Sequence, residues 1–151
     1  MATNLPKRRA PKPKRSVYCN LVIVQRRQFF LFTHATTLFS LWAPAAGWDR
    51  NDFSLRFRRH ATDTLRDYGF ADGDIARIVD DDPDTFATSA DRGIVGSMVD
   101  YAKMLQYTDD YAGGPERMST RSMNDVANEC PMSKIGMASP ARYLRQLLRT
   151  E

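Results

Sequence analysis

The sequence has no long apolar run, and it has few of the residues that build metal sites or disulfide frameworks. None of its apolar stretches approaches the ~20 residues that a membrane-spanning helix needs. Its two cysteines, Cys19 and Cys130, and its two histidines, His34 and His60, do not match zinc-ligand spacing. A Cys19–Cys130 disulfide stays open as an alternative, but reduced thiols are expected of an intracellular protein. We therefore expect no metal, no membrane association and a cytoplasmic location.

The motifs of the common catalytic folds are also absent. Gly93, Gly96 and Ser97 do not form a phosphate-binding loop, because the spacing and the lysine of a P-loop are missing. The sequence has no nucleophile elbow, no zinc-binding histidine pair and no dinucleotide-binding glycine pattern. The aspartates within residues 80–84 lack the glycine and the terminal glutamate of a calcium loop. The sequence therefore predicts no cofactor and favours a role other than catalysis.

Positive charge is concentrated in residues 1–16. The formal net charge is +4, but this segment alone carries six positive charges and no acidic residue, which leaves −2 for residues 17–151. Three prolines and a low apolar content predict a disordered tail without helix, and they do not fit a secretory signal. The tail either only solubilises the protein or contacts nucleic acid or another polyanion in a salt-dependent way. The residues that would make this contact are Lys7, Arg8, Arg9, Lys12, Lys14 and Arg15.

From Val17 onward the sequence changes to a β pattern. Residues 17–24, 28–33 and 37–42 are rich in β-branched and aromatic residues, and the connections between them are short enough for hairpins. Three such strands predict an antiparallel meander. Both faces of the first strand are largely apolar, so we expect helices on both sides of the sheet. Asn20 is the polar exception, and a buried asparagine needs hydrogen-bond partners.

Helical periodicity predicts about four helices after the meander. Asp52 is expected to cap the first of them, and Gly69 with Phe70 is expected to end it. A short helix is expected to start at Asp72-Gly73-Asp74 and to reach Val79, and a short strand is expected near residues 85–89. The remaining signals predict a central helix that Ser97 and Asp100 open as a capping box, an irregular segment at 116–138, and a last helix that begins at Ser139-Pro140. Residues 17–151 are thus predicted to form one α+β domain.

An ordered set of short motifs resembles a family of small, mostly bacterial proteins, the domain of unknown function 6933. The resemblance implies an α+β fold and a bacterial or phage setting, and it supplies no activity. Two features depart from the family pattern: the basic tail replaces a first strand and short helix, and Val99 stands where asparagine is typical. The matching residues are Tyr18 before Asn20-Leu21, Arg26-Arg27, Ser40 with Pro44, Asp52-Phe53, Gly69-Phe70, Asp91-Arg92, Gly96-Ser97-Met98 with Asp100, Asn124, Pro131 and Ser139-Pro140.

Two functional hypotheses follow. The first is a non-enzymatic binding or regulatory protein of a bacterial or phage accessory system, such as a mobile-element, defence or counter-defence system. It would contact a protein partner through its acidic-leaning body and nucleic acid through residues 7–15. The second is an enzyme directed at nucleic acid or nucleotides. Its polar cleft would be formed by the polar residues of the matched pattern, Asn20, Arg92, Ser97, Asp100 and Asn124.

Overall fold

The structure is a computed structural model, and its elements confirm the α+β fold. It describes residues 17–24, 26–79, 86–87, 92–112 and 119–150, so the predicted basic tail lies outside the described residues. Within these ranges the elements are β1 (Val17–Val24), β2 (Arg27–His34), β3 (Ser40–Pro44), α1 (Phe53–Asp67), α2 (Asp72–Val79), β4 (Phe86–Ala87), α3 (Arg92–Ala112), α4 (Thr120–Asn128), a 3-10 helix (Ser133–Ile135) and α5 (Pro140–Thr150).

The three long strands form the predicted antiparallel meander. β1 pairs with β2 along its whole length, with Val17 opposite His34, and β2 pairs with β3, with Thr33 opposite Ser40. β4 lies parallel to the start of β1, so the order of strands in the sheet is β3-β2-β1-β4. The predicted short strand is thus confirmed at Phe86–Ala87.

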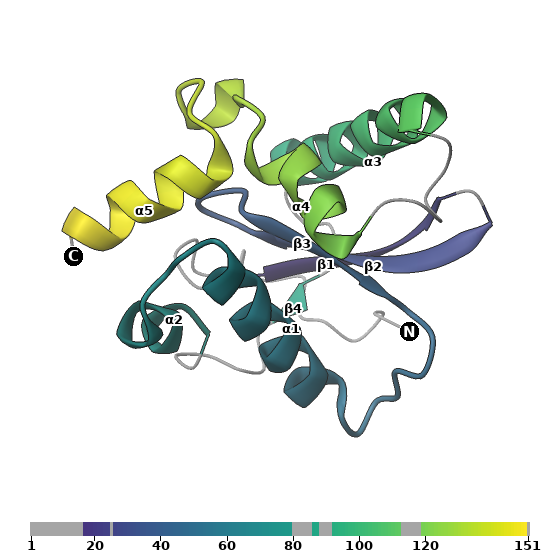
Figure 1. Ribbon diagram of the computed structural model, residues 1–151, viewed down its shortest axis with the longest axis horizontal. Coiled ribbons are helices and arrows are strands. Elements are labelled where there is room, and N and C mark those ends of the chain that lie inside the picture. The colour runs from purple at the N-terminus through teal and green to yellow at the C-terminus, as the bar shows by residue number, and fades with distance from the viewer. Residues whose placement is uncertain (1–16, 25, 80–85, 88–91, 113–118, 151) are drawn as a thin grey trace.

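Helices cover both faces of the sheet, as the apolar strands predict. In Figure 1, α3 and α4 lie on one side of the sheet, and α1 and α2 lie on the other. Successive strand residues point to opposite faces. Leu31 therefore joins the buried cluster under α3 and α4, and Phe32 joins the cluster against α1, α2 and α5. The core thus consists of two apolar layers with the sheet between them.

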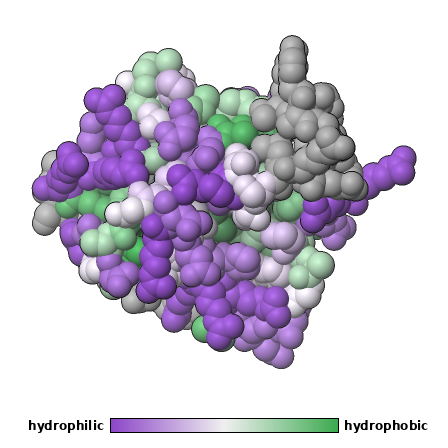
Figure 2. All heavy atoms as spheres, viewed as in Figure 1, coloured by the Kyte–Doolittle hydropathy of each residue, from purple (hydrophilic) through white to green (hydrophobic). Residues whose placement is uncertain are grey.

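Both ends of α1 lie where they were predicted, with Asp52 at the N-cap position and Gly69 after the last turn, but Asp52 does not cap with its side chain. Gly69 has a φ of +84°, and Phe70 N–H donates to the carbonyl of Leu65, the 6→1 hydrogen bond of a Schellman motif. At the other end the Asp52 carboxylate makes no capping hydrogen bond, and it accepts from Arg56 Nε at 2.9 Å instead. Figure 2 shows hydrophilic residues over the outward side of α1.

The predicted capping box at Ser97 and Asp100 is wrong. The helix begins five residues earlier, at Arg92, and Ser97 Oγ donates to the carbonyl of Gly93 within it, at 3.1 Å. Ile94 is buried one turn before Met98, on the same face of the helix as the buried Tyr101 and Leu105. Burial of this extra residue explains why the helix extends backward beyond the local capping signal.

The segment predicted to be irregular contains α4. Ser119 caps this helix by accepting a hydrogen bond from Ser122 N–H at 3.1 Å. Both cysteine thiols are free, which agrees with the reduced state expected from the sequence. None of the described helices combines the length and the apolar content needed to cross a bilayer.

Candidate functional site

The five predicted polar residues do not form one cleft in the described structure. Asn20 lies on β1, where its amide nitrogen contacts Met98 Sδ of α3 at 3.3 Å. Ser97 and Asp100 are also on α3, the first buried and the second exposed. Asn124 lies on α4 against β3, two strands away from β1 in the sheet. Arg92 is the first residue of α3, but its side chain lies outside the described part of the structure.

Asn124 has a structural role that the sequence did not reveal, and it shares this role with Asn128. Asn128 Oδ1 accepts from Ser40 N–H and Asn128 Nδ2 donates to the Ser40 carbonyl, both at 2.7 Å. Asn124 Oδ1 accepts from Trp42 N–H at 2.7 Å. The two residues are one helical turn apart, so their amides satisfy the outer edge of β3 as a neighbouring strand would. The sequence signal was two asparagines at i, i+4 among apolar residues.

A polar cluster around Tyr68 closes the same edge. The Tyr68 hydroxyl donates to Asp125, and Arg121 Nε donates to the same carboxylate at 2.9 Å while its guanidinium lies 4.0 Å from the Tyr68 ring centroid. Arg145 donates to the Tyr68 carbonyl at 2.6 Å. Burial and the hydrogen bond to Asp125 raise the pKa of Tyr68 well above its ordinary value. These partners join α1, α4 and α5 into a clamp, so the cluster has a structural explanation.

The opposite edge of the sheet is different, because part of β1 has no pairing partner there among the described residues. Gln28 and His34 hydrogen bond toward β3, so the alternate residues of β2 bond toward β1. In the β1–β2 register, the backbone N–H and C=O groups of Asn20, Val22 and Val24 therefore point to β2. Those of Leu21 and Ile23 point away from β2, toward the outer edge of the sheet. β4 pairs only with Val17 and Tyr18. No described residue pairs with the outward groups of Leu21 and Ile23.

A groove of about 430 Å³ runs between this free edge and α3. Its floor and walls are mostly apolar, and Asn20 and Lys103 are the polar side chains in it. The side chains of Leu21 and Ile23 are 54% and 66% exposed, and Val99 on α3 is 47% exposed. In Figure 1 the β1–β2 hairpin extends beyond α1, which explains this exposure on the α1 side. The groove is lined by residues 20–24 of β1 and by Val95, Met98, Val99, Ala102 and Lys103 of α3.

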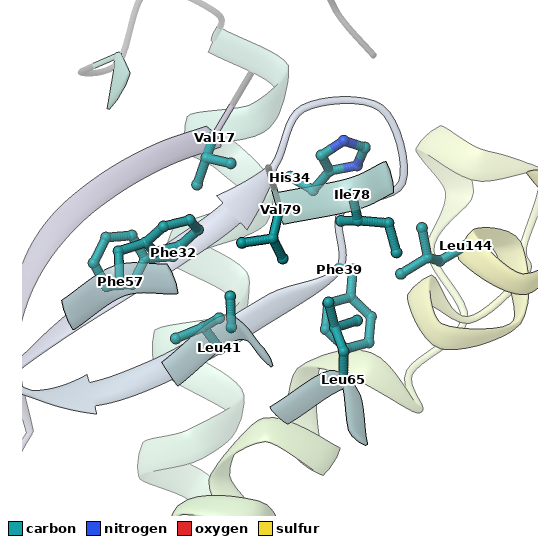
Figure 3. Close-up of a pocket in the computed structure, with 11 residues that line it drawn as sticks. Val17, Phe32, His34, Phe39, Leu41, Phe57, Leu65, Ile78, Val79 and Leu144 are labelled. Carbon is teal, nitrogen blue, oxygen red and sulfur yellow. The ribbon is translucent and has the colours of Figure 1, made fainter. Parts of the chain in front are cut away.

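A second, small cavity lies within the core on the α1 side (Figure 3). It has a volume of about 50 Å³, well below the ~150 Å³ of an engineered apolar cavity that binds benzene. Its lining is apolar apart from His34, which extends from the end of β2 beside Ile78 (Figure 3). His34 Nδ1 lies 2.8 Å from Thr37 Oγ1 and accepts from Thr37 N–H, so the ring holds the β2–β3 turn.

His60 gives a pH-dependent prediction. Its ring stacks on Trp48, with the ring centroids 5.4 Å apart, and burial lowers its pKa from the ordinary value of 6.5. Nearby Arg56 lowers it further, while Asp63 opposes the shift. Because the unfolded chain then binds a proton more readily than the folded one, His60 lowers the stability as the pH falls below 6.5.

Exchange of His60 for glutamine is expected to remove this contribution. The free energy of unfolding of wild type, minus that of His60→Gln, should decrease between about pH 7.5 and about pH 5. Urea titrations at constant ionic strength measure it, because each pH point compares two proteins that share all other titrating groups. A difference that stays constant or increases on acidification would contradict the prediction.

Comparison with known proteins identifies the family but no activity. A family model described as a domain of unknown function (DUF6933) matches residues 3–143. No curated protein matches the chain. The match spans β1 to α4 and the start of α5, and so includes both the asparagine-capped edge and the β1–α3 groove. The chain therefore belongs to the DUF6933 family.

Proposed function

We propose that this protein is a non-enzymatic binding protein whose protein partner docks in the β1–α3 groove. The observation that carries the proposal is that Leu21 and Ile23 combine exposed apolar side chains with outward backbone groups with which no described residue pairs. A free strand edge is a template for pairing with another chain, and proteins normally protect such edges. At the opposite edge of the sheet, α4 protects the backbone of β3 in this way through Asn124 and Asn128.

The distribution of exposed apolar residues supports the same surface. Among the described residues five large apolar side chains are exposed, and three of them, Leu21, Ile23 and Val99, line this groove. The other two, Leu55 on α1 and Met137 after the 3-10 helix, do not line it. Single exposed apolar residues are normal, whereas here Leu21 and Ile23 on the α1 face and Val99 on the α3 side expose apolar surface on both faces of one strand edge, which marks an interaction site.

The geometry gives less support to the enzyme hypothesis. Asn124 uses its amide oxygen for the backbone of β3, and Asn20 contacts a methionine sulfur. Within the described residues, no three His, Cys, Asp or Glu side chains lie where they could hold a metal ion. Nucleic-acid contact through residues 7–15 and a role in a bacterial or phage accessory system stay predictions from the sequence.

A capture experiment with matched charge variants tests the docking surface. Tagged wild type, Val99→Glu and Leu55→Glu are expressed in the source cells, and co-purifying proteins are quantified by mass spectrometry. Val99 and Leu55 are similarly exposed, at 47% and 51%, but only Val99 lines the groove. We expect a partner retained by wild type and Leu55→Glu, and reduced roughly tenfold by Val99→Glu because a carboxylate is costly to bury in an apolar contact.

Circular dichroism of each purified variant confirms that the two glutamates leave the fold unchanged. Equal capture by Val99→Glu and wild type would overturn the proposal.

A further inference from the structure

The edge of β1 and the charges around it specify what kind of segment the groove would take. We infer that the groove binds an extended, acidic segment of another protein, which adds to the sheet as a strand beside β1. This inference rests on the proposed function, and it names the chemistry of the partner.

The backbone of β1 provides the first part of the recognition. Leu21 and Ile23 each direct one N–H and one C=O outward, so together they offer two donors and two acceptors at strand spacing. The edge beyond the β4 pairing runs from Cys19 to Val24, which is about 20 Å of strand at ~3.3 Å per residue. This length is enough for a six-residue strand, and main-chain pairing of this kind supplies affinity in strand-addition complexes.

Side chains on the two faces of the added strand would meet different apolar surfaces. Residues directed to one face would enter the groove against Val95, Val99 and Ala102 of α3. Residues directed to the other face would cover Leu21 and Ile23, which α1 leaves exposed. An occupant with apolar residues at successive positions in its centre would therefore bury both faces.

The charges near the groove indicate that the bound segment is acidic. Lys103 lines the groove, Arg26 is exposed in the β1–β2 turn, and Arg27 is exposed at the start of β2, opposite Val24. Asp100 is exposed on α3 but does not line the groove. One positive charge in the groove and two at the hairpin end of β1 favour a segment with Asp or Glu beside its apolar centre.

The same charges argue against two other occupants. The chain's own residues 1–16 carry six positive charges, which this surface repels, and three prolines, each of which lacks the N–H that strand pairing uses. A second copy that paired antiparallel through β1 would bring Arg26 and Arg27 beside the start of the other β1. That strand directly follows the six basic residues of its own chain.

Peptide selection on the purified full-length protein tests the inference. A display library of random peptides of roughly 12 residues, long enough for the free edge and its flanks, is the probe. We expect the enriched peptides to share a short apolar run flanked by Asp or Glu. The dissociation constant of one enriched peptide is then measured by fluorescence polarisation against wild type and variants.

Two pairs of variants separate charge from backbone recognition. Lys103→Glu should weaken the peptide about tenfold, and Lys134→Glu, which is outside the groove, should not. Ile23→Pro removes an outward N–H that β2 does not use, while Ile23→Ala shortens the side chain and keeps that N–H. Proline should therefore weaken binding several-fold more than alanine does, and the alanine variant controls for the lost side chain.

Other results would overturn the inference. These are enriched peptides that lack acidic residues, equal binding by Ile23→Pro and Ile23→Ala, or a wild-type dimer in analytical ultracentrifugation that Ile23→Pro dissociates. If Val99→Glu still abolishes capture of a cellular partner while no peptide is enriched, the proposed function stands and strand addition is wrong. If substitutions in the groove change neither the capture of a cellular partner nor the binding of a peptide, both proposals fail.

Discussion

Replacement of Asn128 by alanine is expected to lower the free energy of unfolding by about 2–5 kcal/mol, because it leaves two buried backbone groups of Ser40 unsatisfied. The Asn128 side chain is fully buried and holds both the N–H and the C=O of Ser40 at 2.7 Å. Its amide nitrogen also donates to the Tyr68 hydroxyl at 3.4 Å. Water cannot readily replace the lost partners, since Ser40 itself is buried.

Two further variants in α4 calibrate this effect. Asn124→Ala removes one hydrogen bond, to Trp42 N–H, and should cost about 1–3 kcal/mol. Glu129→Ala, at an exposed position at the end of the same helix, should change stability by less than ~0.5 kcal/mol. Urea denaturation followed by far-UV circular dichroism measures all three. A cost of Asn128→Ala no larger than that of Glu129→Ala would show that α4 does not secure the edge of β3.

The sheet and its two covered faces could be predicted because their signals are local. Val17–Val24 and Arg27–His34 are apolar at odd and even positions alike, and that pattern requires cover on both sides. Gly69 marked the end of α1 for a similar reason, since the left-handed conformation there strongly favours glycine.

Two helix predictions failed where tertiary contacts outweighed the local pattern. Ser97 and Asp100 have capping-box spacing, but burial of Ile94 one turn earlier places Ser97 inside the helix. α4 was missed because two of its buried positions are asparagines, and sequence analysis expects asparagine at the surface. Its buried face meets a strand edge, and strand edges are polar. Burial of an amide is therefore favourable there.

The groove itself could not be predicted from the sequence. Its walls are residues 20–24 and 95–103, more than 70 positions apart, and no local pattern indicates that they meet. The sequence predicts that Leu21 and Ile23 are core residues, because they lie among other apolar residues. They are exposed only because α1 does not cover this part of the sheet. Asn20 was identified correctly as an unusual polar residue on this strand, although its contact is the sulfur of Met98.

Trp42→Ala is expected to cost about 3–5 kcal/mol, the usual loss when a fully buried tryptophan is truncated. Trp42 is 1% exposed and packs edge-to-face against Phe29, with the ring centroids 6.3 Å apart. Trp48, on the other side of the sheet, is only half-buried, so Trp48→Ala is a matched control with a smaller expected loss. Similar losses in the two alanine variants, measured by urea denaturation, would contradict this interpretation of the core.

Trp42→Phe keeps the experiment informative if the alanine variant does not fold. The indole N–H of Trp42 has no hydrogen-bond partner among the described residues, so phenylalanine loses apolar area but also removes an unsatisfied donor. We expect a net loss of about 1–2 kcal/mol. The chain has two tryptophans, so this variant leaves Trp48 as the sole reporter on the α1 side. Coincident transitions by fluorescence and circular dichroism would show that the two apolar layers unfold together, as one sheet shared between them requires.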